Sequence, residues 1–215
     1  MTEPLPVNPA GRGLFITFEG IDGSGKTTQI QYAADYLRKQ GRRVVSTREP
    51  GGTAGGEAIR GLILDKALRW EPDAELLMIF AARAQHVAQV IEPALSGGRD
   101  VICDRFTDAS YAYQGGGRGI ADQRIKTLAD WIHPGLTPDL TLLFDTPPEI
   151  GLERTGSRGF QNRFDEEQHR FHVAVREAYL GLAAAQSPRI QIVDGSQRLD
   201  AVRQQVQELI GKLLI

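Results

Sequence analysis

The stretch FEGIDGSGKTT, residues 18–28, decides the fold class of this chain. Within it, GIDGSGKT (20–27) matches the pattern G-x-x-x-x-G-K-[ST], whose glycines let the backbone turn its N–H groups toward a phosphate. An apolar run, LFITF (14–18), precedes the loop, and an amphipathic helical pattern (30–37) follows it. A strand, a glycine-rich loop and a helix in this order form the context that the pattern requires, so we expect the loop to bind nucleotide phosphates.

The loop also supplies a positive charge and a hydroxyl group. Lys26 is expected to reach the β- and γ-phosphates, and the Thr27 hydroxyl can bind Mg²⁺. The helix that begins there directs the positive end of its dipole at the phosphates. We therefore expect the nucleotide to contact Gly20, Ile21, Asp22, Gly23, Ser24, Gly25, Lys26, Thr27 and Thr28. A GTPase would also need the guanine-reading tetrad N-K-x-D, which the sequence does not contain.

Five short apolar runs recur along the chain, and they are continuous rather than alternating. Such runs are typical of strands that are covered on both faces. The runs are LFITF (14–18), RVVST (43–47), DVICD (100–104), LTLLFD (140–145) and RIQIVD (189–194). Helical patterns separate them, which predicts a five-stranded parallel sheet flanked by helices on both faces. With the phosphate loop, this is the α/β architecture of the P-loop NTPase fold.

Length and charge are those of one ordinary globular domain. The chain has 215 residues and a net charge of −2, so its overall charge gives no reason to expect a nucleic-acid or membrane partner. We expect a flexible leader over residues 1–12 and a single domain over 13–215. The single cysteine, Cys103, cannot form an internal disulfide, which favours a reducing, cytoplasmic location.

Three stretches together resemble the thymidylate kinase family. They are FEGIDGSGKTT (18–28), TREPGG (47–52) and DRFTDASYAYQGGGRG (104–119), and the matching organisation runs from Gly13 to the end of the chain. The resemblance implies transfer of a phosphate from ATP to dTMP with Mg²⁺ as cofactor, and a homodimer. The strongly apolar helical pattern of residues 73–95, which is longer than one core face needs, agrees with a dimer.

The resemblance also implies which groups bind the phosphate and sugar of the acceptor dTMP. Arg48 and Arg105 would grip its 5′-phosphate, and the Asp22 carboxylate would accept a hydrogen bond from its 3′-hydroxyl. Asp104 ends the third apolar run beside the phosphate loop, where a carboxylate can hold Mg²⁺ or a water in its shell. Such a transfer is mostly a matter of alignment and charge neutralisation, and these residues supply the groups for it.

The thymine base would lie against the helix of residues 73–95. In similar enzymes an aromatic ring stacks on the base and an arginine one turn later binds it, which points to Phe80 and Arg83. Phe80 stands three positions before Arg83 and Ile79 four, so Phe80 as a plain core residue stays an alternative. Two further residues resemble contacts to the base edge, and one resembles a ring packed on the deoxyribose: Ser110, Gln114 and, for the sugar, Tyr113.

The remaining expectations concern a small lid, about residues 153–167, and the adenine end of ATP. One branch of the family carries an arginine after the loop carboxylate, but this chain has Gly23 there. We therefore expect arginines of the lid, as in the bacterial enzymes, to approach the γ-phosphate: Arg154, Arg158 and Arg163, with Arg158 and Arg163 as first choices. Beside the adenine ring we expect Ser196 and Gln197, although a plain strand-to-helix turn explains the same letters.

Two other functions remain open on the sequence alone. Another small nucleotide or nucleoside kinase could act on dUMP, CMP or thymidine, and dUMP differs from dTMP only by a methyl group. A pocket distinguishes one methyl group by about 1–3 kcal/mol. A nucleotide-binding regulatory protein without phosphotransfer would keep residues 20–27 but has no use for a second, arginine-rich phosphate site.

Overall fold

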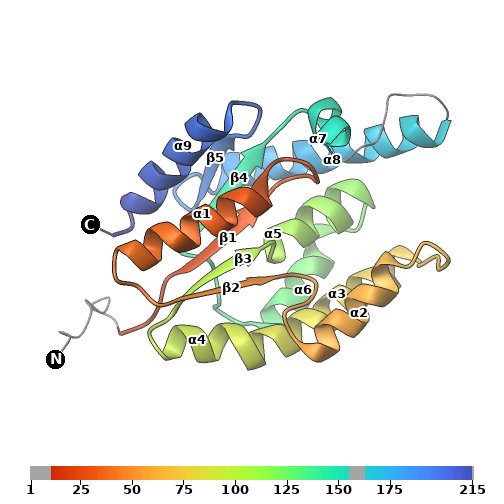
Figure 1. Cartoon of the computed structure of the whole chain (residues 1–215). Helices are drawn as coiled ribbons and strands as arrows, with labels where there is room; N and C mark the ends of the chain where they lie inside the picture. The colour runs from red at the N-terminus through yellow and green to blue at the C-terminus, as the bar shows by residue number, and fades with distance from the viewer. Residues whose placement is uncertain (1–10, 155–162, 215) are drawn as a thin grey trace.

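The computed structural model describes the backbone of residues 11–154 and 163–214, and the side chains of residues 11–154 and 169–214. Most of the expected leader and much of the expected lid lie outside these ranges. The described strands form one parallel sheet in the order β2-β3-β1-β4-β5, which confirms the predicted fold class (Figure 1). The strands are β1 (Phe15–Glu19), β2 (Val44–Arg48), β3 (Asp100–Asp104), β4 (Leu140–Asp145) and β5 (Ile190–Asp194).

Helices connect every pair of consecutive strands. They are α1 (Lys26–Lys39), α2 (Ala54–Leu64), α3 (Pro72–His86), η1 (Val87–Ile91), α4 (Glu92–Ser96), α5 (Thr107–Ser110), η2 (Tyr111–Gly117), α6 (Asp122–Ile132), α7 (Pro148–Arg154), α8 (Arg163–Ala185) and α9 (Leu199–Gly211). The expected helix of residues 73–95 is present as α3, η1 and α4, which follow one another without a break. The π-helical turn η1 inside it was not predicted.

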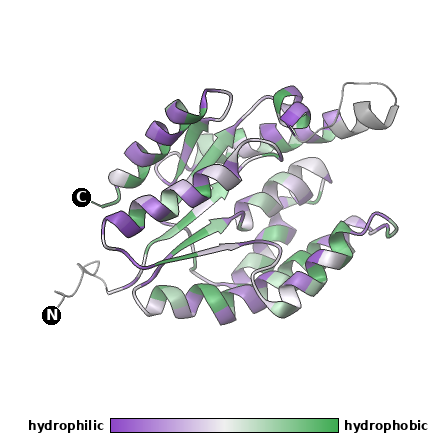
Figure 2. Cartoon of the chain, viewed as in Figure 1, coloured by the Kyte–Doolittle hydropathy of each residue, from purple (hydrophilic) through white to green (hydrophobic). Residues whose placement is uncertain are grey.

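The core lies on both faces of the sheet, as the continuous apolar strands require. On one face α1 and α9 pack against the strands, with Ile16, Phe18 and Leu142 at the centre of the cluster. The other face is covered by η1, α4, η2 and α8, and α3 packs against α6 farther out. Figure 2 shows hydrophobic colour along most of the strands and a mixture of hydrophobic and hydrophilic residues along the helices.

Charged side chains gather at the carboxyl ends of the strands. The last residues of the five strands are Glu19, Arg48, Asp104, Asp145 and Asp194. Because all the strands are parallel, these ends meet at one edge of the sheet, where the phosphate loop also leaves β1. This edge of the sheet therefore carries the charged groups from which a functional site can be built.

The run of glycines in residues 104–119 has a packing role. A Cβ atom on Gly116 would lie 2.5 Å from the Cβ of Ala178, and one on Gly117 would overlap the ring of Phe171. The absence of these side chains lets η2 and α8 approach closely, and π-helical turns of this kind are frequent at functional sites. None of the described helices is long and apolar enough to cross a membrane.

Candidate active site

Two cavities open at the carboxyl edge of the sheet. The first, which we call the P-loop cavity, has a volume of about 440 Å³. Residues 22–28 line it, together with Arg48, Glu49, Arg60, Asp104, Arg105 and Arg154. The phosphate loop and cations from other parts of the chain therefore face one space, as a polyphosphate site requires.

The second cavity, the α3 cavity, has a volume of about 220 Å³ and lies between α2, α3 and residues 105–114. Its wall is more apolar, with Ile63, Leu64 and Ile79 among the lining residues. Four residues line both cavities: Asp22, Glu49, Arg60 and Arg105. The two cavities therefore meet at a wall that carries charges of both signs.

The Lys26 ammonium group is held inside the phosphate loop. Its Nζ donates to the carbonyl oxygens of Gly20 and Ile21, at 2.9 Å each, and lies 3.4 Å from Ser24 Oγ. Burial, and then the charge of Arg105, lower the pKa of Lys26 from 10.5 to about 8. A bound polyphosphate would favour the charged form again, so the lysine is prepared for an anionic ligand.

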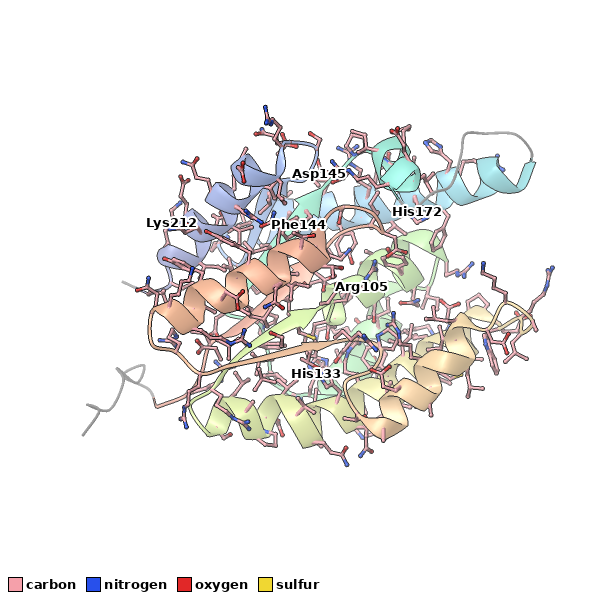
Figure 3. The ribbon with its side chains drawn as sticks, viewed as in Figure 1. Arg105, His133, Phe144, Asp145, His172 and Lys212 are labelled. Atoms are coloured by element: carbon pink, nitrogen blue, oxygen red, sulfur yellow. The ribbon has the colours of Figure 1, made fainter. Side chains whose placement is uncertain are left out.

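Asp22 and Arg105 form an ion pair between the cavities, although 83 residues separate them in the chain. Arg105 Nη2 donates to Asp22 Oδ1 at 2.7 Å, and the guanidinium group also lies over the Tyr113 ring at 4.5 Å. Arg105 lies near the middle of the molecule in the loop after β3 (Figure 3). Desolvation alone would raise the pKa of Asp22, but the charges of Arg105 and Lys26 outweigh it and lower that pKa.

The expected metal-binding residues lie together. Thr27 and Asp104 both line the P-loop cavity, and the buried Oδ1 of Asp104 has no hydrogen-bond partner among the described residues. A buried carboxylate oxygen without a partner is costly unless a cation or an ordered water reaches it. Hydroxyl and carboxylate oxygens are also the ligands that Mg²⁺ prefers, so these two residues fit the cofactor.

Arg83 is buried at the base of the α3 cavity, with 1% of its side chain exposed. Its guanidinium group donates to Glu49 Oε2 at 2.7 Å, to Ser110 Oγ at 3.1 Å and to the Phe106 carbonyl at 3.1 Å. Glu49 Oε1 lies 2.9 Å from His86 Nδ1. Burial alone would raise the pKa of Glu49, but Arg83 and His86 lower it, so the charged carboxylate is the form that pairs with the arginine.

The structure places Ile79, and not Phe80, in the wall of the α3 cavity. Phe80 is 2% exposed and belongs to the apolar cluster between α3 and α6. Its ring lies 4.5 Å from the guanidinium carbon of Arg83 and so supports that side chain from behind. The geometry therefore favours the alternative in which Phe80 is a core residue.

The other expected base and sugar contacts surround the same cavity. Ser110, Tyr113 and Gln114 all line it. The Gln114 amide donates to Glu75 Oε1 at 2.8 Å, so Glu75 is a further polar lining residue that the sequence did not single out. A polar edge opposite the apolar wall suits a flat heterocycle.

Two further arginines, Arg48 and Arg60, lie at the P-loop cavity, and only Arg48 was expected there. Arg48 lines the P-loop cavity and is paired with Glu57 at 2.8 Å, with 53% of its side chain exposed. Arg60 lies on α2, lines both cavities and donates to the Pro50 carbonyl at 2.9 Å. Arg60 was not predicted, and its only signal was its position in the glycine-rich segment after the second apolar run.

No side chain fits at Gly23, because the backbone of Gly151 lies too close to it. The φ of Gly23 is +75°, and a Cβ atom there would overlap the backbone carbonyl of Gly151 on α7. No arginine can therefore replace it without a shift of the loop. Arg154, at the end of α7, lines the P-loop cavity instead and donates to the carbonyl oxygens of Gly195 at 2.9 Å and Gly23 at 3.4 Å.

We expect Gly23→Ala to destabilise the protein. Alanine at a positive φ and an overlap with a backbone carbonyl together cost about 2–4 kcal/mol. Urea unfolding measures this loss. The control is Gly61→Ala on α2, where no atom lies within 4 Å of the added Cβ and a helix gains stability from alanine. An unchanged urea midpoint for Gly23→Ala would contradict the close contact with α7.

The remaining expected residues do not line either cavity or are not described. Ser196 and Gln197 are exposed and bind Asp194 through Ser196 Oγ at 2.5 Å and Gln197 Nε2 at 2.9 Å. Their bonds are those of a plain strand-to-helix turn. Arg158 and the side chain of Arg163 lie outside the described residues.

Comparisons with known proteins agree with this arrangement. The thymidylate kinase family model matches residues 18–206. A thymidylate kinase of Thiobacillus denitrificans is 51% identical over 201 residues, which cover 94% of this chain and 98% of that protein. One from Pseudomonas savastanoi pv. phaseolicola is 52% identical over 205 residues, covering 94% and 97%. The crystal structure of thymidylate kinase from Ehrlichia chaffeensis superposes with a TM-score of 0.77 at 36% identity, covering 95% of this chain and all of that one. The chain therefore belongs to the thymidylate kinase family.

Proposed function

We propose that this protein transfers the terminal phosphate of ATP to dTMP and so makes dTDP for the synthesis of dTTP. Membership of the family makes the chain an ATP-dependent nucleoside monophosphate kinase. The observation that carries the proposal is the shared wall of the two cavities, where Asp22 and Arg105 face both. Two anionic nucleotides can meet end to end only where cations separate and align them.

The P-loop cavity is the ATP site in this proposal. The backbone N–H groups of residues 20–28 and the N-terminus of α1 surround the phosphates, and Lys26 moves from the loop carbonyls to the phosphate oxygens. Arg154 adds a cation at the mouth of the cavity. Of the adenine contacts, Ser196 and Gln197 remain the residues proposed from the sequence.

Mg²⁺ would be held by the Thr27 hydroxyl and, directly or through a water, by Asp104. When bound, the ion neutralises charge on the phosphates of ATP during transfer. Arg158 and Arg163 remain proposed as the lid cations for the γ-phosphate. The support for this assignment is that Gly23 has no room for the arginine that other family members carry there.

The α3 cavity is proposed as the dTMP site. Arg105, with Arg48 and Arg60 beside it, takes the 5′-phosphate, and Asp22 accepts a hydrogen bond from the 3′-hydroxyl. Arg60 and Arg105 line both cavities, and Arg48 lines the P-loop cavity alone. The transferred phosphate would therefore have a short path.

The thymine base lies deeper in the same cavity, against Ile79. Arg83, Ser110 and Gln114 reach its polar edge, and the Tyr113 ring packs on the deoxyribose, where it leaves no room for a 2′-hydroxyl. Phe80 supports Arg83 from behind. A site built from paired polar groups rejects bases that leave those groups unpaired.

We also propose a homodimer in the cytoplasm. The support for the dimer is the exposed apolar side chains of α2 and α3, where Leu62, Leu64 and Leu77 are 47%, 59% and 57% exposed. The support for the cytoplasm is the single, buried thiol of Cys103. Besides the second copy of the chain, the proposed partners are ATP and dTMP, without nucleic acid or membrane.

An acceptor series tests the function. ADP release from ATP and Mg²⁺ is measured with dTMP, dUMP, CMP, AMP and thymidine in turn. We expect dTMP to give the highest kcat/KM and dUMP to fall short by roughly 10-fold to 200-fold, the range that one methyl group provides. CMP or AMP as the best acceptor would overturn the dTMP assignment. No stimulation by any acceptor would overturn kinase activity itself.

A further inference from the structure

Arg105 has an unusual backbone conformation. Among the described residues it is the one non-glycine with a positive φ, 69°. A side chain in this left-handed region is strained, and the conformation persists only where the surroundings hold it. The conformation aims the guanidinium group at Asp22 and at both cavities. The contacts that hold the backbone of Arg105 therefore also orient its side chain.

Three hydrogen bonds hold the backbone around Arg105. Its N–H donates to the Phe18 carbonyl at 3.0 Å, and its carbonyl accepts from Cys103 Sγ at 3.0 Å. The next N–H, of Phe106, donates to the Glu19 carboxyl group at 2.7 Å. A thiol is a weak donor, so the short bond to Glu19 is the main restraint on the carboxyl-terminal side of Arg105.

Glu19 is itself fixed by the helix that covers the sheet. Its side chain is fully buried at the end of β1, and Tyr179 of α8 donates its hydroxyl to Glu19 Oε2 at 2.6 Å. Burial, and then the charge of Asp108, raise the pKa of Glu19 from 4.5 to about 8. Glu19 has no direct ion pair within the described part of the chain, so its two hydrogen bonds are what orient it.

We propose that Glu19 is a positioning residue for acceptor binding: it holds Arg105 in its left-handed conformation and so presents the guanidinium group to the acceptor phosphate. The inference rests on the proposed role of Arg105. Through Tyr179 the same carboxyl group joins α8 to the loop after β3. Nothing in the pattern of hydrogen bonds requires Glu19 to touch a substrate.

The test compares three variants by steady-state kinetics with ATP and dTMP. Glu19→Met keeps the size of the side chain but leaves the Phe106 N–H without an acceptor. We expect the KM for dTMP to rise by about 10-fold to 100-fold, in line with one unsatisfied buried group, while the KM for ATP changes by less than about threefold. Glu19→Gln keeps an acceptor for Phe106 and a partner for Tyr179, so it should restore the KM for dTMP.

Thr17→Val is the matched control for lost stability. Thr17 is fully buried on the same strand and forms a buried hydrogen bond of 2.7 Å with Thr141. We expect it to lower the urea midpoint without changing the KM for dTMP. If Glu19→Met behaves in the same way, Glu19 supports only the fold and the proposal is overturned.

Three further measurements keep the test decisive. If Glu19→Met does not fold, Tyr179→Phe takes its place. It should raise the KM for dTMP by about threefold because the carboxyl group loses one of its two restraints, and an unchanged KM overturns the proposal. A crystal structure of Glu19→Met reports the φ of Arg105 directly, without reference to any substrate. An unchanged KM for dTMP in Arg105→Ala would instead show that the acceptor site is wrongly assigned.

Discussion

Arg105→Ala should lower kcat/KM for dTMP by about 10³-fold, mainly through a higher KM. Truncation of one partner of a buried, hydrogen-bonded charge pair costs about 2–5 kcal/mol. The Arg105 side chain is 15% exposed but the Asp22 side chain is 68% exposed, so most of the expected loss comes from the missing contact with the bound phosphate and little from the pair itself. The variant also leaves the Asp22 carboxylate beside the incoming phosphate without a counter-charge, which adds repulsion. Initial rates over a range of dTMP concentrations measure the effect.

The control for this prediction is another arginine in an ion pair. Arg124 binds Asp73 through two hydrogen bonds of 2.7 Å on the surface, between α6 and the start of α3. Pairs of this kind contribute little to stability, so Arg124→Ala should keep the kinetics of the parent protein. A KM for dTMP that stays the same in Arg105→Ala would remove the arginine from the acceptor site.

The second large effect is expected at Lys26. Lys26→Met should lower kcat by about 10²–10³-fold, which is the usual result of removing one preorganised group that stabilises charge in the transition state. The KM for dTMP should change little, because the lysine is proposed to bind the phosphates of ATP. Lys39→Met, at the exposed end of the same helix, is the control and should leave kcat unchanged.

The stability of Lys26→Met distinguishes a loss of catalysis from unfolding of the variant. The pKa of Lys26 is lowered from 10.5 to about 8 in the folded protein, so the charged form is disfavoured there. The penalty is present in full below pH 8 and disappears as the pH rises toward 10.5. Lys26→Met should therefore be at least as stable as the parent at pH 7, with the difference shrinking above pH 8. Urea unfolding at pH 7 and pH 10 measures both, and a variant less stable at pH 7 would contradict the cost of burying this ammonium group.

Most of the fold could be predicted because its signals are local. Each strand coincides with one of the predicted apolar runs, and the boundaries differ by one residue at most. The phosphate loop follows from the spacing of its glycines, Lys26 and Thr27. The π-helical turn at Val87–Ile91 could not be predicted, because one extra residue in a helical turn leaves the apolar pattern almost unchanged.

The site was harder to predict because its contacts are distant in the chain. The pair of Asp22 and Arg105 depends on the order of the strands, which places β3 beside β1. Ile79 and Phe80 are consecutive and point about 100° apart around α3. Only the rotation of α3 against α6 decides which of them reaches the cavity. Arg60 carries no motif of its own. Its importance appears only when α2 is folded over both cavities.

The contact between Arg105 and Asp22 has a consequence for the choice of ligand. In this structure the Asp22 carboxylate pairs with Arg105, the residue that we propose binds the acceptor phosphate. Asp22 accepts from Nη2 of Arg105, so an incoming phosphate binds the remaining N–H groups or competes for this one, and a doubly charged phosphate group competes better for a guanidinium group than a singly charged carboxylate. An uncharged nucleoside carries no anionic group that could compete with the Asp22 carboxylate for Arg105. At the proposed acceptor site, the pair would therefore favour acceptors that already bear a phosphate over uncharged nucleosides.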